Sequence, residues 1–160
     1  MSGVVNRNPG MVEALLLNKN IYSEHIFDFV HVDRITSKLS IESKGTNRIV
    51  AITDSIRPAG LSDGESESGG FKILKKGNTI KIKDTDTIAG SAATMHNNFI
   101  NIMSLGYSIN ESVAMTSYNC AQNMNEKKLG FIGIGFKADF LLLDDNLNVK
   151  TVYVNGKEIK

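Results

Sequence analysis

Asp54 is the side chain best suited to acid–base chemistry in this chain of 160 residues. It ends the apolar run Arg48-Ile-Val-Ala-Ile-Thr-Asp54 and precedes a loop rich in glycine, serine and proline. An almost wholly apolar strand is typical of a parallel sheet that is covered on both faces, and the carboxyl ends of such strands present catalytic side chains. Aspartate also favours turns, so a turn-capping role for Asp54 is the alternative interpretation.

Three histidines could bind a ligand or support a site. His31 follows Asp28 by three residues, and His25 lies six residues before His31. No carboxylate or cysteine joins this pair at a familiar metal-site spacing, so from the sequence alone structural roles are favoured for both. His96 lies beside two asparagines on a predicted helix, which is typical of a solvated or supporting side chain.

Two short segments could contact an anionic or polar ligand. Arg7 lies in the turn Arg7-Asn-Pro-Gly10, and its guanidinium fork suits phosphate or carboxylate, although a lone surface arginine is usually just solvated. Thr87-Ile-Ala-Gly-Ser-Ala92 reads as a small-residue loop before a helix, so its backbone N–H groups either face a ligand or only start the helix. Cys120, the single cysteine, is predicted to be a small core residue.

Alternating strands and helices in the first third of the chain predict an α/β fold. Apolar spacing predicts helices at 11–17, 33–44 (with Ile35, Leu39 and Ile41 inward) and 92–105, and a capping box, Ser108 to Glu111, starts another. Extended segments are predicted at 21–32, 48–54, 71–83 (turning near Gly77), 138–143 and 149–159 (turning at Asn155-Gly156), with a long polar loop at 57–70. These two or three α/β units are too few for a closed barrel, which needs about 250 residues.

Composition argues against several classes of partner. The net charge of +1 gives no electrostatic reason to expect a nucleic acid or an anionic membrane surface. No apolar run approaches the roughly 20 residues that span a bilayer. Without an export signal or a disulfide framework, the expected location is the cytoplasm.

Four segments together resemble the N-acetylglucosamine-6-phosphate deacetylases of the amidohydrolase superfamily. The turn at Arg7 is similar to the family's Arg-Glu-Pro-Gly, and Asp28-Phe-Val-His-Val-Asp33 is similar to its Asp-Gly-x-His-Val. Ile52-Thr-Asp-Ser-Ile-Arg-Pro-Ala-Gly60 is similar to its Val-Thr-Asp-Ala stretch, and Thr87 to Met95 is similar to its Leu-Ala-Gly-Ser segment. The Val-Asn-Gly hairpin at 154–156 is a weaker signal, because many amidohydrolases end in this way.

The resemblance implies a role for each segment. Asp54 would be the catalytic acid/base, taking a proton from a metal-bound water and delivering it to the departing sugar amine. Arg7 would reach the substrate phosphate across a homodimer interface, His31 would contact the substrate, and Ile88, Ala89 and Gly90 would line the sugar site. The products would be acetate and glucosamine 6-phosphate.

The implied fold is the C-terminal part of a (β/α)₈ metallo-dependent hydrolase barrel plus part of a small β-sandwich. Residues 1–60 and 87–125 would belong to the barrel, and residues 61–86 and 126–160 to the sandwich. The complete enzyme would use a divalent metal, zinc or iron, held by a glutamate and two histidines upstream of the methionine that Met1 resembles. With those ligands missing, this chain alone is expected to bind no metal and to be inactive.

Phe29 departs from the family pattern, because it replaces the glycine of the Asp-Gly-x-His motif and adds a ring where backbone would approach the sugar. Two alternatives to a deacetylase fragment remain. One is a non-catalytic remnant acting as an interaction or oligomerisation module, and the other is an amidohydrolase for a nucleobase or cyclic amide, against which Arg7 and His31 argue. Because a partial barrel exposes strand edges and apolar faces, we expect homo-oligomers or pairing with an N-terminal half.

Overall fold

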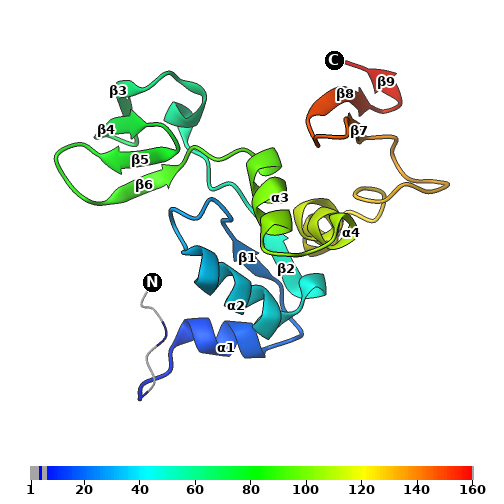
Figure 1. Ribbon diagram of the computed structural model, residues 1–160, viewed down its shortest axis with the longest axis horizontal. Helices are drawn as coiled ribbons and strands as arrows, with labels where there is room; N and C mark the ends of the chain where they lie inside the picture. The colour runs from blue at the N-terminus through cyan, green and yellow to red at the C-terminus, as the bar shows by residue number, and fades with distance from the viewer. Residues whose placement is uncertain (1–3, 5–6, 160) are drawn as a thin grey trace.

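Two parallel strands and the helices around them form the centre of the molecule (Figure 1). The computed structural model describes residue 4 and residues 7–159, so Met1 lies outside the described residues. β1 (Ser23–His25) pairs with β2 (Ile49–Ala51) in parallel, and α2 (Arg34–Lys44) connects them. α1 (Met11–Leu17) packs on α2 and has the predicted bounds, whereas α2 begins one residue later than predicted, because Asp33 is its cap.

The hydrophobic core lies between this β–α–β unit and the later helices. These helices are α3 (Met95–Ser104), α4 (Ile109–Val113), the π-helical turn η3 (Ala114–Tyr118) and α5 (Asn119–Asn123). Phe27, Ile49, Ile102 and Met115 are fully buried in one cluster. Each such side chain contributes about 1.5–3 kcal/mol by leaving water, so this cluster fixes α3 and η3 against β1 and β2.

Two antiparallel sheets extend from this centre. β3 (Gly64–Ser68), β4 (Phe71–Lys76), β5 (Thr79–Ile82) and β6 (Ile88–Ser91) form one sheet in that order. β7 (Phe140–Leu143), β8 (Val149–Val154) and β9 (Lys157–Glu158) form the other, and Figure 1 shows the two on opposite sides of the helices. The predicted hairpins at Gly77 and Asn155-Gly156 are confirmed. The division of the chain into barrel and sandwich stays a prediction.

The predicted β-rich run at 21–32 is wrong beyond His25. Only Ser23–His25 is a strand, because the side chain of Asp28 accepts hydrogen bonds from the backbone N–H groups of Val30 and His31 and turns the chain. Phe29 takes a positive φ of 59° within this turn. The turn therefore replaces the second half of the predicted strand.

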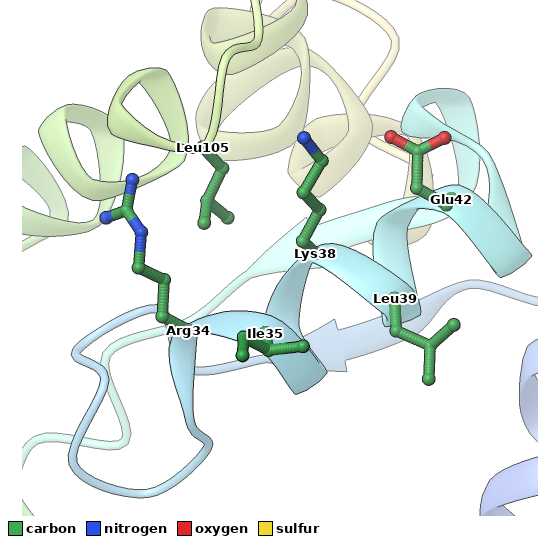
Figure 2. Close-up of a pocket in the computed structure, with 6 residues that line it drawn as sticks. All are labelled: Arg34, Ile35, Lys38, Leu39, Glu42 and Leu105. Atoms are coloured by element: carbon green, nitrogen blue, oxygen red, sulfur yellow. The ribbon is translucent and has the colours of Figure 1, made fainter.

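The predicted inward face of α2 is also wrong in part. Ile41 is buried as expected, but Ile35 is 78% exposed and Leu39 is 54% exposed. The face that packs inward carries Ser37, Ser40, Ile41 and Lys44 instead. Ile35 and Leu39 line an open groove of about 430 Å³ that Leu105 borders (Figure 2).

Two segments predicted as loops contain strands. Arg57–Gly60 forms a 3₁₀ turn, and Gly64–Ser68 pairs with β4 in register, with Gly64 opposite Lys75. The alternating Glu and Ser residues of β3 carry no apolar signal, because edge pairing uses backbone groups and leaves the side chains in water. The other segment, Thr87 to Ala92, contains β6, and α3 begins only at Met95.

Among residues 4 and 7–159, no helix combines the length and apolar character needed to cross a membrane.

Candidate active site

The carboxyl ends of β1 and β2 bring the candidate residues to one edge of the molecule. The parallel register places His25 opposite Ala51, and the N–H of Ile52 continues the ladder to the carbonyl of His25 at 3.0 Å. Asp28 follows β1 by three residues, and Asp54 follows β2 by the same number. Because β1 and β2 are parallel, their carboxyl ends lie at the same edge, so Asp28 and Asp54 both follow strands that end there.

Asp54 presents its carboxylate outward from this edge. Its side chain is exposed, and its backbone lies in the left-handed region at a φ of 49°. Aspartate tolerates that conformation better than most residues, because its short polar side chain can bond locally. The Asp54 carbonyl accepts a hydrogen bond of 3.0 Å from the N–H of Ser91, which fixes the backbone, while the carboxylate has no hydrogen bond to any residue that the structure describes.

β6 reaches the same edge through Gly90. The α-carbon of Gly90 lies so close to the loop after β2 that an added Cβ would be 2.8 Å from Cγ2 of Ile56 and 3.3 Å from the carbonyl oxygen of Asp54. Its φ of 155° also disfavours any side chain. Ser55 and Ser91 then form a parallel bridge. Ile88 and Ala89 are half-buried on this strand, beside the loop that carries Asp54.

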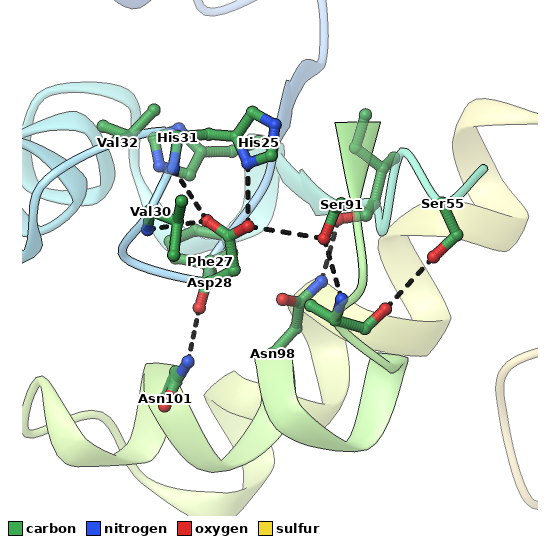
Figure 3. A network of polar contacts seen from close by, with 12 residues as sticks. His25, Phe27, Asp28, Val30, His31, Val32, Ser55, Ser91, Asn98 and Asn101 are labelled. Carbon is green, nitrogen blue, oxygen red and sulfur yellow. Dashed lines mark hydrogen bonds and ion pairs between the residues drawn. The ribbon is translucent and has the colours of Figure 1, made fainter. Parts of the chain in front are cut away.

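The carboxylate of Asp28 accepts four hydrogen bonds behind this edge (Figure 3). Its Oδ1 accepts from the N–H groups of Val30 at 2.9 Å and His31 at 3.0 Å. Its Oδ2 accepts from Nδ1 of His31 at 2.7 Å and from Oγ of Ser91 at 3.3 Å. Burial raises the pKa of the Asp28 carboxyl, but the hydrogen bonds from His31 and Val30 outweigh it and hold that pKa below its usual value.

His25 and His31 differ in their surroundings. Nε2 of His25 lies 3.1 Å from Oγ of Ser37, and its ring contacts Phe27 at a centroid distance of 4.4 Å. Burial lowers the pKa of His25 to about 4, although the charge of Asp28 partly opposes this. His25 is therefore a neutral packing residue at neutral pH. His31 keeps 18% of its side chain exposed, and among the hydrogen bonds of the described residues its ring is held only through Nδ1.

Arg7 lies apart from these residues. It is exposed in the turn before α1, and Figure 1 shows this segment at the start of α1, well away from β6. Within one chain, Arg7 therefore does not join Asp54 and His31. The contact that the resemblance implies for Arg7 needs a second chain.

Two asparagines of α3 support the edge and were not singled out in the sequence. Nδ2 of Asn98 donates to the carbonyl of Ile52 at 2.8 Å, and Nδ2 of Asn101 donates to the carbonyl of Phe27 at 2.7 Å. They fix the chain just after β2 and β1, respectively. The sequence did carry a signal for them, because the two asparagines are three residues apart on the helix face that also carries Phe99 and Ile102. A polar pair on an apolar face needs buried hydrogen-bond partners.

The residues present do not fit a metal site. In the part of the chain that the structure describes, no three side chains among His, Cys, Asp and Glu are grouped so that they could hold a metal ion. Nε2 of His25 is engaged by Ser37, and Nδ1 of His31 is engaged by Asp28. The described residues by themselves therefore do not provide a set of ligands for a catalytic metal.

Sequence comparison matches residues 13–159 to the model of the amidohydrolase family. The chain belongs to the amidohydrolase family. It is 29% identical over 98% of its length to an N-acetylgalactosamine-6-phosphate deacetylase of Shewanella, of which the match covers 40%. It is 30% identical to a putative N-acetylgalactosamine-6-phosphate deacetylase of Escherichia coli K12, over 98% of this chain and 94% of that protein.

Solved structures of this amidohydrolase class have the same fold. The N-acetylglucosamine-6-phosphate deacetylase of Thermotoga maritima superposes with a TM-score of 0.93 at 33% identity, over 99% of this chain and 44% of that one. A mutant of the Mycobacterium smegmatis enzyme, in complex with N-acetyl-D-glucosamine-6-phosphate, gives 0.92 at 29% identity, over 99% of this chain and 42% of that one. The predicted fold class is confirmed, and the chain spans about two fifths of the length of the first curated relatives it matches.

Proposed function

We propose that this chain supplies the acid/base and substrate-contacting part of a deacetylase that converts N-acetylglucosamine 6-phosphate to glucosamine 6-phosphate and acetate. The observation that carries the proposal is the meeting of Asp54 and β6 at one edge. Ser91 bonds the carbonyl of Asp54, and Gly90 leaves no side chain between β6 and the Asp54 loop. Relatives and structural neighbours named as amino-sugar-phosphate deacetylases support the choice of substrate.

In the proposed reaction, Asp54 acts as a general base and then as a general acid. Its carboxylate takes a proton from the attacking water, whose oxygen bonds to the acetyl carbon. It then gives that proton to the sugar nitrogen as the C–N bond breaks, which releases acetate and the amine. An exposed carboxylate on a fixed backbone suits such a shuttle, and general acid–base catalysis of this kind contributes about 10²- to 10⁴-fold to rates.

The other proposed residues bind the substrate. His31 contacts the sugar, Ile88, Ala89 and Gly90 line its ring, and Arg7 of a second chain binds the phosphate. A zinc or iron ion belongs to the complete enzyme, with ligands supplied by polypeptide beyond these 160 residues. We therefore propose that the chain works only when it is paired with an upstream half, and that it is inactive alone.

The test is acetate release from N-acetylglucosamine 6-phosphate with added zinc or iron. The chain alone should give no turnover, and adding a polypeptide with the upstream half of a structural neighbour should restore it. Asp54→Asn should then lower kcat at least about 10²-fold. The matched control is Asp84→Asn, because Asp84 is also an exposed aspartate at positive φ, 61°, but lies in the β5–β6 turn.

Two results would contradict the proposal. Full activity of Asp54→Asn in the complemented enzyme would remove Asp54 from the chemistry. Turnover by the chain alone, lost in Asp54→Asn, would show that the assignment of the metal ligands to another polypeptide is wrong. The 4-epimer, N-acetylgalactosamine 6-phosphate, belongs in the same assay because three relatives are named as deacetylases of it, and a higher kcat/KM for it would reassign the substrate.

A second candidate function is a non-catalytic module for association. The exposed apolar side chains favour it, among them Ile35 at 78%, Ile132 at 83% and Ile134 at 106%. This function predicts that the chain forms a stable oligomer and that no upstream polypeptide restores acetate release. Restored turnover would exclude it as the sole function.

A further inference from the structure

The Asp28 carboxylate determines which nitrogen of His31 carries a proton. Oδ2 of Asp28 lies 2.7 Å from Nδ1 of His31, and the side chain of Asp28 is only 2% exposed. Hydrogen bonds hold the pKa of Asp28 below its usual value, so the carboxylate is ionised at neutral pH and can only accept. Nδ1 must therefore be the donor, whether the imidazole ring is neutral or charged.

Nε2 of His31 is the nitrogen that remains available. Among the hydrogen bonds of the described residues, His31 uses its backbone N–H and Nδ1, both toward Asp28, and Nε2 has no partner. In a neutral ring with the proton on Nδ1, Nε2 accepts a hydrogen bond from a hydroxyl or amide N–H group. In a charged ring it donates to a carbonyl or phosphate oxygen.

Ser91 links this arrangement to the strand at the candidate site. Its Oγ donates to Oδ2 of Asp28 at 3.3 Å and accepts from the N–H of Ala93 at 2.9 Å. Ser91 is completely buried and directly follows Gly90 on β6 (Figure 3). The same carboxylate oxygen therefore sets both the ring of His31 and the end of the strand that carries Ile88 to Gly90.

We propose that Asp28, anchored by Ser91, is a positioning residue that keeps the proton of His31 on Nδ1 and presents Nε2 to the sugar substrate. The proposal rests on the proposed function for its last part, in which His31 contacts the substrate. Its first part concerns the protein alone. The two parts are therefore measured separately.

Asp28→Asn is the most decisive test, because neighbouring backbone N–H groups fix the orientation of the introduced amide group. The N–H groups of Val30 and His31 both point at the Oδ1 position, so the amide oxygen stays there. The NH₂ group then occupies the Oδ2 position and faces Nδ1 of His31, to which it can only donate. Nδ1 must become an acceptor, so the proton of the neutral ring moves to Nε2.

The tautomer is read by long-range ¹H–¹⁵N correlation NMR on the 160-residue chain at alkaline pH, with His31 assigned through the loss of its signals in His31→Gln. We expect the Nδ1–H form in the wild type and the Nε2–H form in Asp28→Asn. Asp33→Asn is the matched control, because Asp33 also accepts a backbone N–H, from Ile35 at 2.8 Å, without a hydrogen bond to His31. It should keep the wild-type tautomer.

An Nε2–H tautomer in the folded wild type would overturn the proposal. So would an unchanged Nδ1–H tautomer in a folded Asp28→Asn. If Asp28→Asn does not fold, the wild-type tautomer still decides. Ser91→Ala serves as the second variant, and it should keep the Nδ1–H form, because His31 retains its contact with Asp28.

The second part is measured in the complemented enzyme. Asp28→Asn should lower kcat/KM about 10- to 100-fold, because Nε2 of the neutral ring then carries the proton and is a hydrogen-bond donor to the substrate instead of an acceptor. Reversal of the tautomer with unchanged kcat/KM would show that His31 does not contact the substrate, which overturns this part alone. A complemented wild type without turnover would instead contradict the proposed function and leave the tautomer result standing.

Discussion

At the scale of single residues, His25 links the stability of the fold to pH. Burial lowers its pKa from 6.5 to about 4, despite the nearby charge of Asp28. The unfolded chain therefore binds a proton at a higher pH than the folded chain does. The stabilisation is fully present above about pH 6.5 and is lost as the pH falls toward 4, and in total it amounts to about 3 kcal/mol.

We predict that the free energy of unfolding falls by about 2 kcal/mol between about pH 7 and about pH 5 because of His25. Urea titrations at the two pH values measure this difference. His25→Gln should flatten it, because glutamine does not titrate. His96→Gln is the control and should keep the wild-type slope, since His25 is untouched. A slope that is equal in the wild type and in His25→Gln would contradict the assignment.

At the scale of elements, two lysines hold α1 and α2 together end to end. Nζ of Lys44 donates to the carbonyls of Leu15, at 2.6 Å, and of Asn18, at the C-terminal end of α1. Nζ of Lys19 donates in return to the carbonyl of Ser43, in the last turn of α2. Burial, followed by the charges of Lys19 and Arg48, lowers the pKa of Lys44. Each ammonium group satisfies carbonyls that a helix end leaves unpaired.

Lys44→Met should therefore cost about 2 kcal/mol of unfolding free energy, because it leaves carbonyls of α1 without their charged donor. Because α1 has only seven residues and buries none of them fully, its amide protons should exchange faster than those of α3. Chemical denaturation and hydrogen exchange measure the two effects. Lys38→Met is the matched control, since Lys38 is exposed on the same helix and should change stability by less than about 0.5 kcal/mol.

Elements with a clear apolar period or a cap were predictable, and elements held by polar contacts were not. The helices at 11–17 and 33–44 and the capping box of Ser108 were found in the sequence, because their signals are local. The inward face of α2 was missed, because a buried lysine that caps another helix looks like a surface lysine. β3 was missed for a related reason, since its edge position needs no apolar side chains.

The candidate site was predictable where motifs carried it. Asp54, His31 and the segment from Ile88 to Gly90 were named from the sequence, and the structure brings Asp54 and that segment together. Asn98 and Asn101 were not named, because their partners are carbonyls more than 40 residues away in the chain. Contacts of that kind arise only when the helix docks.

At the scale of the whole molecule, the described chain leaves its central sheet incomplete. β1 pairs only with β2 among the described strands, so the other edge of β1 offers unpaired backbone groups. Parallel sheets are normally covered and extended on both sides, because their strands are apolar. The open groove beside Ile35 and Leu39 adds apolar surface that water covers in a single chain (Figure 2). Association with more polypeptide would pair the open edge of β1 and cover the apolar groove.

We therefore predict that the isolated chain self-associates. Sedimentation equilibrium should give a weight-average mass that rises with concentration above the 17.5 kDa of one chain. An equimolar upstream-half polypeptide should convert this mixture into a species of fixed composition, because completion of the barrel occupies the edge of β1 that self-association would use. Ile35→Glu with Leu39→Glu tests the groove separately, since both side chains are exposed in the single chain, and it should lower the weight-average mass if the groove takes part in self-association. A mass of one chain at every concentration would contradict the prediction, because it would mean that the open edge and the groove are stable in water.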